Sequence, residues 1–140
     1  MHYLSAGCAI EARLKEIAAI KDVLSGTELS RLQDKAIRSS SCFVVYAGDK
    51  AVELTSPNMT KVTQMWLVVL AVRFANEAAK TRQEAGELMS EVMLHLNGFS
   101  PLEGADLRLQ PSPPPDFSNS IGFYPMAYSL DVNMRSGNCN

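Results

Sequence analysis

The side chains best able to do chemistry in this chain are two histidines and three cysteines, and they are widely spaced. His95 follows Val92 on an expected helix, and Cys42 begins an expected strand. A histidine beside a cysteine can act as a base and nucleophile pair, but no spacing brings these two residues together. Cys42 has neither a flanking glycine nor a helix start that would activate its thiol. We therefore expect a structural or interfacial role for His95 and a small, buried apolar role for Cys42.

Three carboxylates, Glu84, Glu87 and Glu91, lie at helical spacing and could form half of a two-metal site. Such a site also needs a Glu-x-x-His pair, whereas Glu91 and His95 are four residues apart. The spacing therefore favours a solvated helix face. The chain also lacks a phosphate-binding loop, a dinucleotide fingerprint, a nucleophile elbow and a zinc-protease motif. We expect a protein that is not an enzyme, with no cofactor and no metal site.

Length and composition indicate one globular domain. The chain has 140 residues, 46% of them hydrophobic and 20% charged, and a formal net charge of −2. This composition excludes intrinsic disorder and nucleic-acid binding by bulk electrostatics. The longest apolar run, Met65–Val72, is too short to cross a membrane, and the N-terminus lacks the basic region of a signal peptide. Three cysteines without a CxxC pair indicate reduced thiols in a cytoplasmic protein.

Hydrophobic periodicity predicts two clear helices and four strands. The helices are expected near 5–19 and 77–96, and a short third helix follows the capping-box spacing that starts at Ser25. Strands are expected at 42–46 (ended by Gly48-Asp49), 62–75, 107–109 and 121–132. The run Pro111–Pro115 cannot enter a sheet interior, and Pro125 indicates an edge position or a bulge.

This order predicts an α+β fold, a two-layer sandwich of two helices on a mixed or mainly antiparallel sheet. We expect a single domain over residues 1–133 and a disordered tail over 134–140.

The strand expected at 62–75 is apolar on both faces, which requires cover on both sides. One interpretation is that the long helix covers one face and the N-terminal helix the other. The alternative is that a partner subunit covers one face, which the methionine content and the charge-poor C-terminal third also favour. The candidate oligomer interface consists of Met65, Leu67, Val69, Arg73, Phe123 and Pro125.

The layout resembles the tail terminator proteins of tailed bacteriophages, in particular the Mu-like tail proteins and the lambda minor tail protein U group. The resemblance covers roughly residues 5–133. It rests on the amphipathic helix with Ala9–Leu14, the strand Cys42–Gly48, the long strand Trp66–Arg73, a following helix and the closing strand Gly122–Val132. The stretch 20–41 departs from the family, because Ser25-Gly26 and Ser41-Cys42 stand where a Pro-Gly turn and a proline are expected.

The resemblance implies a structural role. Family members form a ring, typically a homohexamer, that caps the tail tube, stops its elongation and presents the head-attachment interface. The implied partners are further copies of the chain, the tail tube protein and the head–tail connector, with no nucleic acid and no membrane. The implied location is the virion tail, with assembly in the host cytoplasm. Another head–tail joining or tail assembly protein, or a small cytoplasmic enzyme or ligand-binding protein, remains an alternative.

Overall fold

The computed structural model describes residues 2–26, 40–56, 59–73, 78–118 and 120–135. Its helices are α1 (Ser5–Leu14) and α2 (Ala78–Leu96). Its strands are β1 (Asp22–Ser25), β2 (Ser41–Ser56), β3 (Met59–Arg73), β4 (Arg108–Gln110), β5 (Asp116–Ser118) and β6 (Ile121–Arg135). The short helix expected after Ser25 lies outside the described residues.

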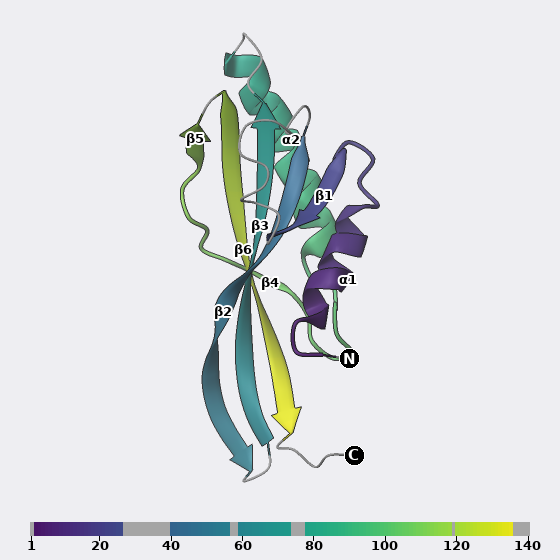
Figure 1. Cartoon of the computed structure of the whole chain (residues 1–140), viewed down its shortest axis with the longest axis vertical. Helices are drawn as coiled ribbons and strands as arrows, with labels where there is room; N and C mark the ends of the chain where they lie inside the picture. The colour runs from purple at the N-terminus through teal and green to yellow at the C-terminus, as the bar shows by residue number, and fades with distance from the viewer. Residues whose placement is uncertain (1, 27–39, 57–58, 74–77, 119, 136–140) are drawn as a thin grey trace.

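The strands form one mixed sheet in the order β1-β2-β3-β6-β4, with β5 also paired to β6 (Figure 1). The β1–β2 pair is parallel, and the other pairs are antiparallel. Helices α1 and α2 contact each other and pack against the same sheet face. The prediction of a two-layer α+β sandwich is confirmed, whereas the interpretation that the helices cover opposite faces is wrong.

The core lies between this sheet face and the two helices. Period-two alternation turns Trp66, Val68 and Leu70 of β3 toward the helices. The helical stripe of α2, which includes Leu88 and Val92, packs against them. The rest of the core is supplied by α1, β2 and β6 through Ala6, Ile10, Leu14, Cys42, Val44, Met126, Tyr128 and Leu130.

The long strands continue beyond both helices as a three-stranded extension (Figure 1). We call this the arm; it comprises residues 47–56 of β2, 59–64 of β3 and 130–135 of β6. The expectation that the first long strand ends at Gly48-Asp49 is wrong. Gly48 adopts a left-handed φ of 106°, and a bulge between Tyr46 and Asp49 lets the strand bend and continue.

Two further differences come from tertiary packing. Helix α1 ends at Leu14, five residues before the predicted end, because tight turns then lead the chain toward β1. These turns still bury Ile17 and Ile20 in the core. Strands β1 and β5 were not predicted, since each is too short to show a hydrophobic period.

Pro125 occupies a locally open stretch of β6. Strand β5 pairs with Ile121–Phe123 and β4 with Ala127–Ser129, so none of the described strands pairs with residues 124–126 on that side. The register with β3 runs through Pro125 without a bulge. An edge position therefore accounts for the proline, because the missing N–H interrupts no sheet bond there.

Candidate functional site

The predicted interface residues lie together on the sheet face that carries neither helix. Alternation along β3 places Met65, Leu67 and Val69 there, and cross-strand pairing sets Pro125 beside Val69 and Phe123 beside Ala71. All five predicted apolar residues are half-buried. We call this set, Met65, Leu67, Val69, Phe123 and Pro125, the outer patch. Arg73 is exposed at the end of β3 and pairs with Ile121.

The outer patch surrounds a second, smaller apolar cluster. Phe43, Ala71 and Ile121 are almost fully buried on this face. Val69 and Phe123 pack against them. Both faces of the sheet are therefore apolar at its centre, as the sequence predicted.

A polar cluster ends the apolar surface where the arm begins. Thr63 donates a hydrogen bond to Asp131 Oδ1 at 2.7 Å. Asp131 also lies 3.9 Å from the Lys61 ammonium and 4.0 Å from the Arg108 guanidinium. The outer face thus changes from apolar to charged along β3 and β6, and this change defines one border of the outer patch.

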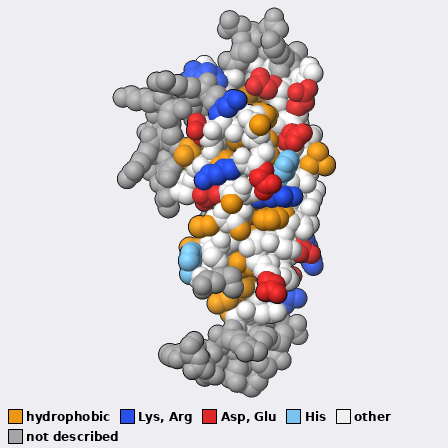
Figure 2. Space-filling view, turned by 90° about the vertical axis from the view of Figure 1, so that its right-hand side faces the viewer, with side chains coloured by type: hydrophobic (Ala, Val, Ile, Leu, Met, Phe, Trp, Pro, Cys, Tyr) orange, Lys and Arg blue, Asp and Glu red, His pale blue; other side chains and the backbone are white. Residues whose placement is uncertain are grey.

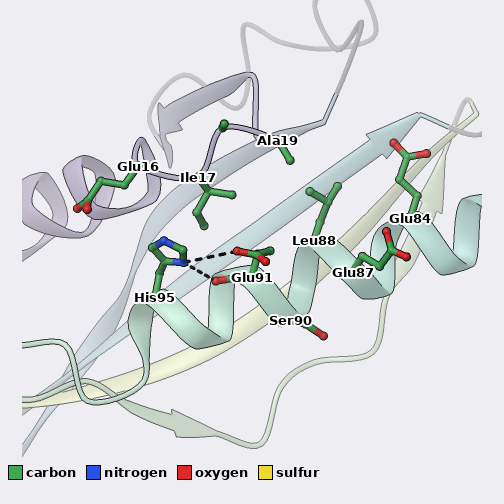
Figure 3. Close-up of a pocket in the computed structure, with 10 residues that line it drawn as sticks. Glu16, Ile17, Ala19, Glu84, Glu87, Leu88, Ser90, Glu91 and His95 are labelled. Carbon is green, nitrogen blue, oxygen red and sulfur yellow. Dashed lines mark hydrogen bonds and ion pairs between the residues drawn. The ribbon is translucent and has the colours of Figure 1, made fainter.

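The carboxylates singled out in the sequence line a groove between α2 and the turn that follows α1 (Figure 3). The groove has a volume of about 690 Å³, with Ile17 and Leu88 among its lining residues. Glu84, Glu87 and Glu91 are exposed along α2, as expected for a solvated helix face. Figure 2 shows acidic and basic side chains interspersed with apolar ones over this edge of the molecule.

His95 lies at one end of the groove and is held by its own helix. Its Nδ1 lies 2.8 Å from the Glu91 carbonyl and 3.9 Å from the Glu91 carboxylate (Figure 3). A carbonyl oxygen only accepts, so Nδ1 carries the proton in this contact. The nearby Ser90 hydroxyl donates to the Gly86 carbonyl at 3.0 Å. This groove therefore contains no paired base and nucleophile among its described lining residues.

The cysteines are separated by burial. Cys42 is fully buried beneath the helices, and burial raises the pKa of its thiol from 9.0 to about 12. Cys8 is exposed on α1. Within the described residues, no group of three or more His, Cys, Asp or Glu side chains is placed to hold a metal ion.

A hydrogen-bonded network, not foreseen from the sequence, ties the N-terminal residues to the start of the arm. The hydroxyls of Tyr3 and Tyr46 both donate to Asp49 Oδ2. Fully buried Gln64 donates to the Tyr3 carbonyl at 2.7 Å and accepts from Trp66 Nε1 at 3.0 Å. Burial and the bond to Asp49 raise the pKa of Tyr46. Only a long-range pairing brings these residues together, so no local motif could have identified them.

The proline run forms an exposed segment along the edge of β6. We call Pro111–Pro115 the proline strap; all five residues are exposed. The Ser112 hydroxyl accepts from the Ala127 N–H at 3.0 Å and donates to the Gln110 carbonyl at 3.2 Å. Beyond the strap, Phe117 stacks edge-on against Tyr124 at 6.0 Å. The strap is thus anchored at both ends while its prolines face solvent.

Comparison with models of protein families shows to which family the chain belongs. The family model described as phage tail terminator protein matches residues 1–138. The chain belongs to the phage tail terminator family. A comparison of this tail terminator with curated proteins gives no match. No helix in the described part of the terminator is both long and apolar enough to span a membrane.

Family membership favours the outer patch over the groove beside α2 as the functional site. A phage tail terminator is a structural component of the tail, which agrees with the resemblance drawn from the sequence. Its function then depends on surfaces that contact other tail proteins. In the described part of this terminator, the outer patch, the arm and the proline strap are candidates for such surfaces.

Proposed function

We propose that this protein assembles as a hexameric ring that caps the tail tube, stops its elongation and forms the head-attachment interface. The role is non-catalytic. The family supports a tail component, and the ring extends that assignment to a specific assembly. The partners are further copies of the chain, the tail tube protein and the head–tail connector.

The observation that carries this proposal is the outer patch. An antiparallel sheet of a lone domain commonly exposes polar residues on the face away from its helices. Here Met65, Leu67 and Val69 of β3 occupy that face beside Phe123 and Pro125. Contiguous exposed apolar surface with a polar border is typical of a protein–protein contact. We propose that a neighbouring subunit covers the outer patch, with Arg73 at its margin.

The arm supports a second set of contacts. It extends past both helices, so it can reach a partner that does not touch the body of the subunit (Figure 1). Residues 130–135 of β6 lie beyond the short strand β4, and their outer edge carries no described strand. Free strand edges readily add a strand from another chain. We propose that the arm contacts the tail tube or the connector.

An aspartate placed in the outer patch tests the ring directly. Leu67→Asp or Val69→Asp should leave the subunit folded and abolish assembly, because a buried charge without a partner opposes association. Light scattering after size-exclusion chromatography measures the mass, and electron microscopy of tails measures tube length. Tails assembled with either variant should be longer and heterogeneous.

Leu94→Asp is the matched control. Leu94 is 74% exposed on α2, so this variant should assemble and terminate tails normally. Normal rings and normal tails from Leu67→Asp would contradict the proposal. Loss of the fold, seen as loss of a cooperative thermal transition, would assign the outer patch to the subunit core instead.

A further inference from the structure

We propose that the proline strap of one subunit docks into a groove beside α1 of the next subunit. This inference rests on the proposed ring and specifies one of its contacts. The groove has a volume of about 390 Å³ and includes Leu4, Gly7, Cys8, Tyr46 and Trp66 in its lining. We call it the aromatic groove.

The prolines of the strap determine which kind of surface can bind it. The described peptide bonds include no cis bond, and each proline disfavours the helical region for the residue before it. We therefore expect the strap to take the extended, left-handed polyproline conformation, about 15 Å long. Such a segment has already lost most of its conformational entropy and docks in aromatic-lined grooves. Exposed Leu109 and Phe117 flank it and widen the apolar ridge.

The aromatic groove supplies that complementary surface. Trp66 lies at its floor with 4% exposure. Tyr46 packs edge-on against Trp66 at 5.2 Å. Gly7 lets α1 approach closely, since a Cβ there would lie 2.8 Å from the Trp66 ring. The volume is at the lower end of that of ligand pockets, so it suits a few side chains of a ridge.

The two surfaces lie at opposite edges of the sheet. The strap connects β4 to β5 on the β6 side, whereas the groove lies beside β2 at the β1 side (Figure 1). A contact between different edges of two copies is heterologous: the joined pair still offers one free strap and one free groove. Repetition of such a contact closes a ring when the rotation between neighbouring copies allows it. Because the proposed ring needs two different contact surfaces on each subunit, a second copy is favoured as the occupant over an unrelated protein.

A peptide titration tests the contact without assembly. Trp66 is the single tryptophan of the chain, and a synthetic peptide of residues 108–118 contains none, so Trp66 emission reports occupancy of the groove. We expect a saturable change with this peptide. A control peptide with Pro113, Pro114 and Pro115 replaced by alanine should bind about tenfold or more weakly, equivalent to about 1.4 kcal/mol.

Cross-linking tests the same contact in the assembly. In a Cys139→Ser background, Pro114→Cys should be joined to Cys8 of the neighbouring subunit by a short bismaleimide, giving a ladder of covalent multimers. Leu94→Cys, exposed on α2, is the matched control and should give no ladder. Light scattering records the assembly state of the same samples.

The outcomes separate the two proposals. A ladder from Pro114→Cys alone, with binding of the peptide, supports the contact. Rings that form without the ladder and without peptide binding overturn the strap contact and leave the ring intact. Peptide binding by a chain that stays monomeric even with tail tubes supports the contact and overturns the ring. A monomer that binds no peptide overturns both.

Discussion

The hydroxyls of two tyrosines differ in their hydrogen bonding: that of half-buried Tyr46 has a partner, and that of Tyr128 has none among the described residues. The Tyr46 hydroxyl donates a hydrogen bond to the Asp49 carboxylate. Tyr128 is fully buried, and its hydroxyl has no hydrogen-bond partner among the described residues. Burial raises the pKa of Tyr128 to about 12. A buried polar atom without a partner costs stability, whereas a satisfied one contributes modestly.

Replacing these hydroxyls should therefore have opposite effects. Tyr128→Phe is expected to leave the free energy of unfolding unchanged or raise it by up to about 1–3 kcal/mol, the cost of an unsatisfied buried group. Tyr46→Phe should lower it by about 1 kcal/mol. Urea denaturation of both variants measures the difference. A clear loss of stability in Tyr128→Phe would show that its hydroxyl has a partner in solution.

The buried Cys42 thiol should lower the free energy of unfolding at alkaline pH. Burial raises the pKa of Cys42 from 9.0 to about 12, so between these values the unfolded chain has lost a proton that the folded chain retains. The stabilising contribution is complete below about pH 9 and is lost as the pH rises toward 12. Cys42→Ala should be less stable at neutral pH, because of the cavity, but its free energy of unfolding should fall less steeply between pH 9 and 10. Parallel slopes in the two proteins would contradict this assignment.

Among the secondary-structure elements, β2 differs most from its expected form. It runs for 16 residues because the bulge at Tyr46–Asp49 absorbs the change in direction between body and arm. Gly48 supplies the left-handed φ of 106° that this bend requires. The bend thus depends on one residue without a side chain.

Gly48→Ala tests that dependence. A Cβ at Gly48 would have no heavy atom within 4 Å, so the substitution introduces no clash. The left-handed conformation alone should lower the free energy of unfolding by about 1–2 kcal/mol. Gly86→Ala is the matched control, since its Cβ also meets nothing within 4 Å but the residue lies in α2; there the change should stabilise slightly. Equal effects in thermal denaturation would rule out a special role for the bend.

The sequence predicted the elements that have a long hydrophobic period. The stripe of α2 and the two-faced β3 were correct to within about three residues, and the residues proposed as an interface share one face. What it could not predict depends on distant contacts: β1 is a strand only because β2 lies beside it, and the Tyr3–Asp49 bond joins residues 46 positions apart. The groove beside α1 likewise needs four elements, α1, β1, β2 and β3, to form.

At the scale of the whole molecule, all the described strands join one sheet, and the main core lies on the face of that sheet that carries the helices. The domain expected over residues 1–133 stays a prediction, as does the tail over 134–140. Strand β6 continues to Arg135 at the end of the arm, and residues 136–140 lie outside the described ones.

A chain ending at residue 133 tests these boundaries. This truncation removes Met134 and Arg135 and so breaks only the last two residue pairs between β6 and β3, at the far end of the arm. We expect a cooperative unfolding transition within a few degrees of that of the full chain, because about 1 kcal/mol shifts the melting temperature of a domain of this size by only a few degrees. Scanning calorimetry measures it. Two transitions, or none, would contradict a single domain over 1–133.

The position of β6 also has a consequence for biosynthesis. It is the last of the described strands to leave the ribosome, yet it pairs with β3 in the interior of the sheet and supplies Met126, Tyr128 and Leu130 to the core. The nascent chain therefore leaves one edge of β3 unpaired and its core incomplete until translation reaches this strand, and the sheet closes only afterwards. Folding is delayed to the end of synthesis, so truncated translation products should be bound by chaperones or degraded and should not enter tails.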